Sequence, residues 1–505
     1  MKFILKIMLA LFFFNTQRVF ALELDKKIDS VFAPFSDFFS KIVFFPVNIA
    51  GVDVPILILL LIFASIFASL YLNGINLWGF GYAVKQIIKK DNNGNSDGEV
   101  SSLQALSTAL SGTLGLGSIA GVAIAISVGG PGAMFWMFFG AFFGMALKFF
   151  ECTLAVKYRK FNPDGSISGG PMFYMAHGLT RKGMRKFGEV LALFFAIMCI
   201  PGSLGGGNML QVNQATQQII YMTGGENSFF FNNAWVCGLI LMIIVALIIV
   251  GGIKSIANVA SKIVPVMCGL YMLISCFIIV INFTNIPEVL YTIIKTAFQS
   301  TSVAGGVIGC IIIGMRRSIQ SNEAGAGSAP IAYAATMTKE PISQGFVALL
   351  EPFFTVVMCS MTASVIIITK QYQNYTDGIT GIQLTSSAFG SVSSFFPYIL
   401  SFVIVLFALS TVISWAYYGQ KAWCYIFGEG TKRIKAFQIM FCLFIVIGSS
   451  MNLQSVVDFT DATMLAMALP NLITIFILMP EIKQDLKDYC ARFKVFNWLG
   501  VKINK

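Results

Sequence analysis

Long apolar segments recur along the chain, and they constrain its fold more than any other feature. We place about eleven of them, each close to the 20 or so residues that cross a bilayer as a helix. They lie near residues 55–74, 104–128, 132–156, 190–221, 235–252, 264–282, 303–335, 345–369, 397–425, 437–452 and 459–480. The sequence therefore predicts an all-α polytopic membrane protein with about eleven transmembrane helices.

The distribution of positive charge predicts the orientation of these helices. The net charge is +11, but the basic residues lie mostly in short loops, as in membrane proteins, so nucleic-acid binding is not needed to explain them. One side would carry Lys85, Lys89, Lys90, Lys157, Arg159, Lys160, Arg181, Lys182, Arg185, Lys186, Lys254, Lys262, Lys339, Lys432, Arg433, Lys435 and the C-terminal tail. The other would carry only Lys26, Lys27, Lys41, Lys295 and Lys370. This predicts an outside N-terminus and a cytoplasmic C-terminus.

The two ends of the chain differ from the apolar middle. Residues 1–21 have a basic start, a short apolar run and a small-residue ending, which is typical of a secretory signal peptide; an uncleaved cap is the alternative. Residues 22–54 would then be extracytoplasmic, and residues 55–480 would form the transmembrane domain. Residues 481–505 are predicted to form a basic cytoplasmic tail, which is solvated or, as an alternative, binds lipid or a partner.

Two of the predicted spans contain glycine-rich interruptions. Gly-Leu-Gly-Ser at 115–118 lies in the segment 104–128, and Gly-Ala-Gly-Ser at 325–328 lies in the segment 303–335. Each begins a set of five segments, 104–282 and 303–480, and five is an odd number, so the second set would be inverted in the membrane. Broken helices at matching places in inverted halves indicate a binding site near the middle of the membrane. Close helix packing through small residues is the alternative explanation.

The chemistry of such a site follows from the exposed backbone. The N–H groups that start one half-helix suit a carboxylate, and the carbonyls that end the other suit sodium or an ammonium group. A zwitterionic amino acid would satisfy both kinds of group.

Several charged residues lie within or beside the apolar segments, where charge is costly and usually functional. We expect Arg316 or Arg317 to pair with Asp461; that this pair closes an outer gate is implied by the family resemblance given below, and a permanent structural pair is the alternative. Glu323 would brace the second break or, as the alternative, carry a proton. Glu151 and Glu351 are interpreted as structural.

Seven strings resemble the bacterial alanine or glycine:cation symporters. They are GTLGLGSIAGVAIAISVGGPGAMFWM (112–137), AVKYR (155–159), GGPMFYM (169–175), GGNMLQVN (206–213), MRRSIQSNEAGAGSAPIAYAA (315–335), STVISWAYYGQKA (410–422) and PNLI (470–473). The resemblance covers nearly all of the chain after residue 50. It implies the leucine-transporter fold, with five plus five inverted helices, one extra helix in front, and two broken helices.

The resemblance also implies a set of site residues. The turn at 115–117 would bind the amino-acid carboxylate through its backbone amides. Substrate contacts are implied for Gly112, Leu116, Gly117, Ser118, Gln211, Gln320, Ala326 and Trp415. Sodium ligands are implied for the carbonyls near Thr113 and Leu114 and for the hydroxyls of Ser321, Ser410 and Thr411.

Departures from the family pattern lie at or next to this site. Leu116 and Ser118 stand where the family usually has threonine and asparagine, and Gln320 stands where it has a phenylalanine lid. A buried amide needs a hydrogen-bond partner. The resemblance implies a small neutral amino acid such as alanine or glycine as the substrate, and these departures indicate a polar neutral amino acid as the alternative.

Other function classes are less consistent with the sequence. A proton-coupled transporter of the same fold is the nearest alternative. A channel would need a continuous polar pore, and a sensor would need an output domain. The motifs of metalloproteases and serine hydrolases are absent, which argues against an enzyme. We expect no cofactor besides sodium as the coupling ion, and the sequence does not indicate an oligomeric state.

Overall fold

The structure, a computed structural model, describes Pro34 and residues 43–49, 52–88, 98–163, 165–299, 306–374 and 381–495. The predicted signal segment 1–21 and most of the predicted extracytoplasmic segment 22–54 lie outside these residues.

The first half of the chain is almost entirely helical. Its main helices are α2 (Ile56–Tyr71), α3 (Ile75–Trp78), α4 (Phe80–Ile88), α5 (Ser102–Thr113), α6 (Ala120–Gly129), α7 (Ala133–Lys157), α8 (Pro171–Phe173), α9 (Leu179–Arg181), α10 (Arg185–Leu204), α11 (Leu210–Met222), α12 (Ala234–Ile249), α13 (Gly252–Ile281) and α14 (Ile286–Ala297). A 3-10 turn, η1 (Leu116–Ser118), separates α5 from α6, and the π-helical turns η2 (Tyr174–Gly178) and η3 (Gly205–Met209) precede α9 and α11. Short 3-10 turns are η4 (Gly225–Asn227), η5 (Phe229–Phe231) and η6 (Phe283–Asn285).

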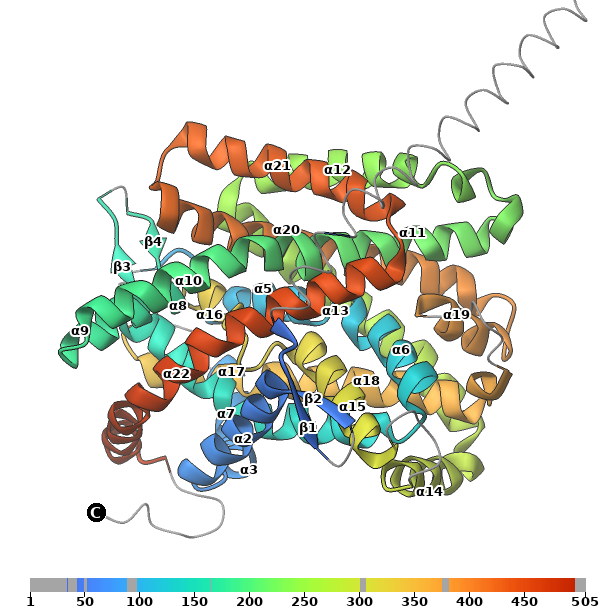
Figure 1. Ribbon diagram of the computed structural model, residues 1–505, viewed down its shortest axis with the longest axis horizontal. Helices are drawn as coiled ribbons and strands as arrows, with labels where there is room; N and C mark the ends of the chain where they lie inside the picture. Colours follow the sequence, from blue (N-terminus) through green and yellow to red (C-terminus); the bar gives the residue numbers. More distant parts are fainter. Residues whose placement is uncertain are drawn as a thin grey trace, which may run out of the picture.

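The second half continues the bundle. It contains α15 (Gly306–Asn322), α16 (Pro330–Tyr333), α17 (Pro341–Ala348), α18 (Leu350–Ile368), η7 (Gln371–Asn374), α19 (Ile382–Gly390), α20 (Phe396–Phe427), α21 (Thr431–Ser450) and α22 (Leu453–Phe493). Helix α20 packs against both α10 and α21, and all three lie in the upper part of the view in Figure 1. The predicted all-α architecture is confirmed.

Within the described ranges, seven helices are long and apolar enough to cross a membrane. The count rises to nine if two bent pairs are each taken as one span: α2 with α3 and α4, bent by 68°, and α5 with η1 and α6, bent by 58°. The shorter α12 and the interrupted α15–α16 segment fall outside that count. Including both would give eleven, a number that stays a prediction, as does the inverted repeat.

The predicted second interruption and the predicted tail can be located on the helices. Helix α15 ends at Asn322, just before the Gly-Ala-Gly-Ser pattern at 325–328. Helix α22 continues without a break past residue 480 to Phe493, so the segment assigned to the basic tail begins within this helix. Residues 496–505 lie outside the described part of the chain.

A small β-hairpin precedes the first helix, which the sequence patterns did not predict. Its strands β1 (Pro46–Ile49) and β2 (Val52–Pro55) pair antiparallel, and Asn48 donates a 3.0 Å hydrogen bond to Asp53. Strand β2 lies against α2 and α15, in the middle of the view in Figure 1. This places the hairpin beside the helix that carries Arg316 and Arg317.

Several loops that the sequence assigns to the cytoplasm gather at one end of the molecule. The two short strands β3 (Lys160–Phe161) and β4 (Ile167–Ser168), helix α9 and the end of α22 lie on the left in Figure 1. Lys157 forms ion pairs there with Glu481, at 2.7 Å, and with Asp485. The basic loop after α7 and the C-terminal helix therefore share one side; which side faces the cytoplasm stays a prediction.

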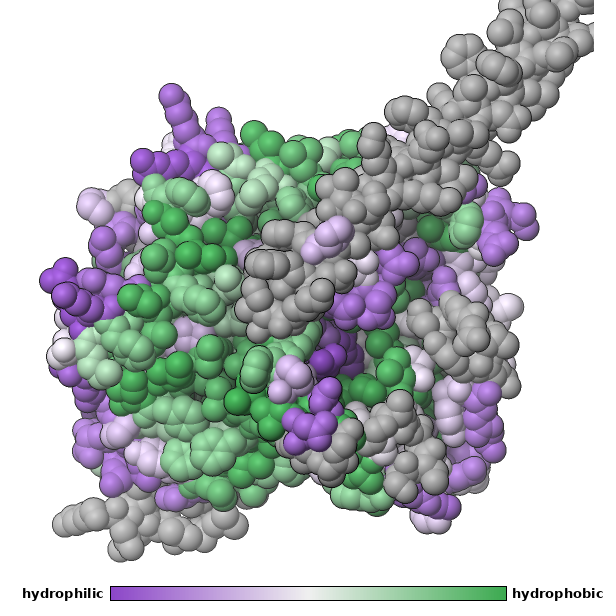
Figure 2. Space-filling model, viewed as in Figure 1, coloured by the Kyte–Doolittle hydropathy of each residue, from purple (hydrophilic) through white to green (hydrophobic). Residues whose placement is uncertain are grey.

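The surface is consistent with a bilayer environment. Hydrophobic side chains cover much of the middle of the face in Figure 2, while hydrophilic ones gather towards its edges. Largely exposed aliphatic residues such as Leu247 and Val250 would be unfavourable in water but suit lipid.

Candidate functional site

The first break lies between α5 and α6, and its backbone is enclosed by other helices. Residues from Thr113 to Ser118 are all buried. The amide N–H of Leu116 donates to Oε1 of Gln211 at 2.8 Å, and Nε2 of Gln211 donates to the Gly206 carbonyl at 2.9 Å. A side chain at position 115 would lie 2.6 Å from Oγ1 of Thr411, so the close approach requires glycine. The backbone N–H of Leu116, which is predicted to bind the substrate carboxylate, is thus bonded to the side-chain oxygen of Gln211 from α11.

The second break runs from Glu323 to Ala329, between α15 and α16. The side chain of Asn322 accepts a 2.8 Å hydrogen bond from the Ala324 amide and so helps to end α15. Glu323, Gly325 and Gly327 all have positive φ, of 55°, 88° and 82°. Glycine adopts this conformation without steric cost, which explains why the Gly-x-Gly pattern located this break in the sequence.

The first break faces α15 just before the second break begins. The Ser321 hydroxyl lies 3.2 Å from the Gly117 carbonyl oxygen and 2.6 Å from that of Arg317. A Cβ added to Gly117 would lie 3.2 Å from the Gln320 carbonyl oxygen. Ser118, also fully buried, accepts a 3.0 Å hydrogen bond from Thr362 through its carbonyl. The predicted residues of the two broken helices are therefore in direct contact.

The predicted sodium ligands on α20 form an oxygen-rich group against α5. Oγ1 of Thr411 lies 2.9 Å from the Ser111 carbonyl and 3.0 Å from the Phe407 carbonyl, and Ser410 Oγ lies 3.0 Å from the latter. Ser414 donates to the Ser111 hydroxyl at 3.0 Å. The nearby end of α5, at Thr113 and Leu114, supplies carbonyls that lack helical partners. Hydroxyl and carbonyl oxygens of this kind suit a sodium ion.

Three of the predicted substrate residues lie away from the Leu116 amide. The Trp415 indole packs on Gly207 and donates a 3.1 Å hydrogen bond to Glu323, which places it at the second break. Ala326 is fully buried in that break, and its amide donates to the Glu323 carbonyl at 3.1 Å. Gly112 faces Tyr418. These three positions stay proposals as substrate contacts.

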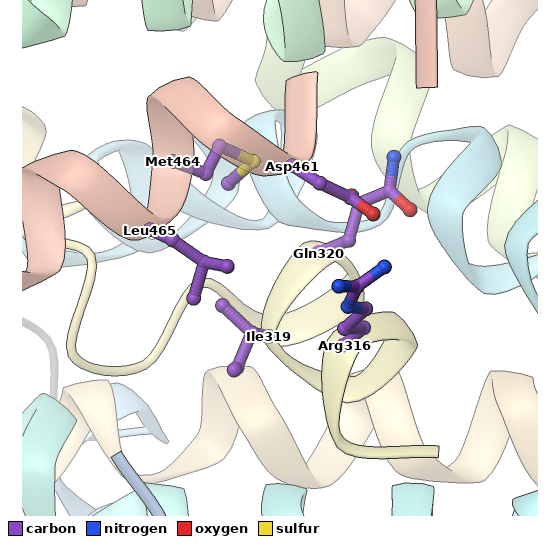
Figure 3. Close-up of a pocket in the computed structure, with 6 residues that line it drawn as sticks. All are labelled: Arg316, Ile319, Gln320, Asp461, Met464 and Leu465. Carbon is purple, nitrogen blue, oxygen red and sulfur yellow. The ribbon is translucent and has the colours of Figure 1, made fainter. Parts of the chain in front are cut away.

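A buried ion pair joins α15 to α22 at the predicted gate. Arg317 donates to the carboxylate of Asp461 and also to Oε1 of Gln320, and the side chains of Arg317 and Asp461 are each 5% exposed. In Figure 3, Arg316 and Gln320 from α15 point towards Asp461 of α22 around a cavity of about 10 Å³, which is about the room that one water needs. Of the two arginines considered, the structure pairs Arg317 with Asp461. Arg316 instead lies over the Phe44 ring, 4.3 Å away.

A second group of buried charges contains Glu151 and Glu351, which the sequence analysis interpreted as structural, and Lys148, which it did not single out. Lys148 on α7 forms a 2.8 Å ion pair with Glu351 on α18, and neither side chain is exposed. Asn471 on α22 links Glu151, at 2.6 Å, to the Gly325 carbonyl, at 2.8 Å. A lysine inside the apolar segment 132–156 was the available signal, because charge at that depth is costly.

Comparisons with known proteins place this geometry in context. The sequence profile of the sodium:alanine symporter family matches residues 39–497. The sodium/alanine symporter AgcS of Methanococcus maripaludis is 38% identical over 439 residues, which are 86% of this chain and 94% of the relative. The "probable sodium/glutamine symporter GlnT" of Bacillus subtilis is 36% identical over 413 residues, which are 81% and 82% of the two chains.

A solved structure shows the same fold. The crystal structure of MhsT in complex with L-phenylalanine matches with a TM-score of 0.52 and 13% sequence identity, over 76% of this chain and 89% of that one. At this level of identity the likeness concerns the fold alone.

Proposed function

The chain belongs to the sodium:alanine symporter family, and we propose that it takes up a small neutral amino acid, such as alanine or glycine, together with sodium by alternating access. The family and its characterised relatives are transporters and not enzymes. We further propose eleven spans in a five-plus-five inverted arrangement with one helix in front, in a bacterial inner membrane, with the N-terminus outside.

One observation carries this proposal most directly. The first break contacts the last turn of α15, just before the second break, in the buried interior, where the Ser321 hydroxyl lies 3.2 Å from the Gly117 carbonyl oxygen. Irregular backbone within a membrane is tolerated where it is buried in protein or lines a polar cavity, and transporters use such paired breaks to bind substrate and ion. The contact therefore supports a shared site between the halves of the chain.

We propose that Gln211 holds the place of the substrate carboxylate. Its amide oxygen accepts the Leu116 N–H at 2.8 Å, which is the hydrogen bond that a bound carboxylate would make. Substrate binding would then exchange a neutral acceptor for a charged one, and a charge-assisted hydrogen bond is stronger. Ser118 and Gly117 complete this side of the proposed pocket.

For sodium, we propose the oxygens where α5 and α20 meet. The hydroxyls of Ser410 and Thr411, with carbonyls near Thr113 and Leu114, supply neutral oxygen ligands for a hard cation. Ser321 would contribute a further hydroxyl from α15. Sodium bound there would join both broken helices and α20, which couples ion binding to closure of the site.

For the outer gate, we propose the pair Arg317–Asp461, with Gln320 attached to it. Gln320 receives a hydrogen bond from Arg317 through Oε1, while its Nε2 has no hydrogen-bond partner among the described residues. Opening the Arg317–Asp461 pair would break the hydrogen bond between Arg317 and Gln320. The gate and the substrate site would then respond together.

The same Gln320 favours a second candidate substrate class, polar neutral amino acids. A buried amide N–H without a partner is costly, and a polar substrate side chain would supply the acceptor. The relative named for glutamine transport agrees with this alternative. Glu323 has hydrogen-bond donors on both carboxylate oxygens, from Trp415 and Ser328, which favours its role as a brace over proton coupling.

Uptake of a labelled amino-acid panel into proteoliposomes tests these proposals. We expect uptake to require an inward sodium gradient and to fall to background when choline replaces sodium at fixed pH. Uptake that persists in choline and follows a pH gradient would favour the proton-coupled alternative. Strongest competition by alanine or glycine would exclude the polar-substrate candidate, and strongest competition by glutamine would favour it.

A further inference from the structure

A cluster of buried charges lies beside the second break, apart from the proposed substrate and sodium residues. Lys148 and Glu151 lie three residues apart on α7 and so share one face of that helix. Glu351 on α18 pairs with Lys148 at 2.8 Å, and Glu323 lies in the break itself. Lys148 interacts electrostatically with all three carboxylates, which joins them into one cluster.

The charges of this cluster do not balance. One ammonium group faces three carboxylates, and none of the four residues is more than 2% exposed. An uncompensated charge in such an interior costs several kcal/mol, and neighbouring carboxylates raise that cost. The cluster must therefore take up positive charge from its surroundings.

The hydrogen bonds distinguish the three carboxylates. Glu351 has the ammonium group of Lys148 on Oε1, while its Oε2 has no hydrogen-bond partner among the described residues. Glu323 has N–H and O–H donors on both oxygens, and such contacts with charge or donors favour an ionised carboxylate. Glu151 accepts one hydrogen bond, from Asn471 to Oε1, while its fully buried Oε2 has no hydrogen-bond partner among the described residues. Glu151 is thus the carboxylate with the least support for a negative charge.

The surroundings of Glu151 suit a proton better than a metal ion. No group of three or more histidine, cysteine or acidic side chains within the described ranges could hold a metal. The titratable groups that face Glu151 are Lys148 and Cys152 on α7, Glu351 on α18 and Tyr174 in η2. A metal ion would need several oxygen ligands, whereas a proton needs only the one free oxygen of Glu151.

We propose that Glu151 is a proton-binding site that controls the second break. In its neutral form, Glu151 keeps Asn471 in place, and Asn471 holds the Gly325 carbonyl at 2.8 Å while accepting a hydrogen bond from Tyr174. Loss of the proton adds a second uncompensated negative charge to the cluster, in which Glu351 interacts with both Glu151 and Glu323. The resulting repulsion loosens the contacts that hold the turn at Gly325.

Infrared difference spectroscopy on the purified, lipid-reconstituted protein tests the site itself. We expect the carbonyl band of a protonated carboxylic acid in the wild type at neutral pH and its loss in Glu151→Gln. Glu481→Gln, at a carboxylate near the protein surface, is the matched control and should keep the band. A wild type without the band, or a band that survives in Glu151→Gln, would overturn the proposal.

A second variant covers the case in which Glu151→Gln does not fold. Asn471→Leu removes the hydrogen bond to Oε1 of Glu151 and should shift the same band to higher frequency. An unshifted band in Asn471→Leu would assign the proton to another residue and contradict the proposal. These readings need no transport, so their failure is distinct from failure of the proposed symport.

The link to the break is tested by uptake, and this part rests on the proposed function. We expect the uptake rate of the wild type to fall at alkaline pH, where Glu151 loses its proton. Glu151→Gln mimics the neutral acid, so it should transport and its uptake rate should stay constant at alkaline pH. A wild-type pH profile in Glu151→Gln would contradict control of the break by this proton.

Discussion

At the scale of single residues, buried charges and hydroxyls determine what the interior can bind. The Arg317–Asp461 pair and the Ser410–Thr411 hydroxyls are each almost fully enclosed. Substituting one member of a buried polar pair is costly, because the other member is left buried without a partner. Substitutions at these positions should therefore have larger effects than equivalent changes at the surface.

Asp461→Asn tests the gate. The substitution leaves Arg317 buried without a counter-charge, and breaking a buried pair costs about 3–5 kcal/mol. We expect the uptake rate to fall at least about tenfold, and the thiol of Leu465→Cys, at a residue that lines the same cavity, to react faster with an impermeant maleimide. Glu189→Gln, which breaks an exposed pair with Arg185, is the control and should change neither. Unchanged rate and labelling in Asp461→Asn would rule out the gate.

Thr411→Val tests the sodium site. The valine keeps the shape of the side chain but removes the Oγ1 ligand, and one lost ligand worth about 1.4 kcal/mol corresponds to a tenfold loss of affinity. We expect the sodium concentration for half-maximal uptake to rise about tenfold. Thr369→Val removes a similar hydroxyl that bonds only to carbonyls of its own helix, at the far end of α18, and should leave the sodium dependence unchanged. Equal sodium dependence in both variants would exclude Thr411 as a ligand.

At the scale of helices, the two breaks depend on glycines that permit close approach. A Cβ on Gly117 would lie 3.2 Å from the Gln320 carbonyl oxygen, so Gly117→Ala should push α15 away from η1. We expect uptake to fall at least about tenfold while the melting temperature stays within a few degrees, since one tight contact costs about 1–3 kcal/mol.

Gly269→Ala is the matched control for Gly117→Ala. Gly269 lies in α13, and a Cβ added there would meet no atom within 4 Å. Alanine also favours the helix by about 1 kcal/mol over glycine. We therefore expect normal uptake and equal or higher stability. Normal uptake in Gly117→Ala as well would show that transport does not depend on the close contact between the first break and α15.

Much of the helical architecture could be predicted because it depends on local composition. Apolar length indicated the helices, and the Gly-x-Gly-Ser patterns indicated both breaks. The exact end of α15 could not be predicted because it depends on Asn322, whose side chain accepts the Ala324 amide only in the folded arrangement. The Lys148–Glu351 pair joins residues 203 positions apart, and no local pattern specifies such a contact.

At the scale of the whole molecule, the orientation in the membrane determines whether the Arg317–Asp461 pair lies on the outer side. The basic loop after α7 and the end of α22 share one side through the Lys157–Glu481 pair. The positive-inside rule assigns that side to the cytoplasm.

Single cysteines can test this orientation. In a background that carries Cys276→Ser, because Cys276 is the exposed cysteine within the described ranges, Lys186→Cys and Glu226→Cys place reporters in different loops. We expect an impermeant maleimide added to intact cells to label position 226 and to label position 186 only after the membrane is opened. The reverse pattern would show that the assignment of the two sides is wrong.

Binding of a labelled amino acid to the purified protein, measured against sodium concentration, tests the central claim most directly. If paired breaks hold amino acid and sodium in one site, each ligand must raise the affinity for the other. We predict that replacing sodium with choline weakens binding of the transported amino acid at least about tenfold, a coupling of about 1.4 kcal/mol. Equal affinity in sodium and choline would contradict a shared site between the two breaks.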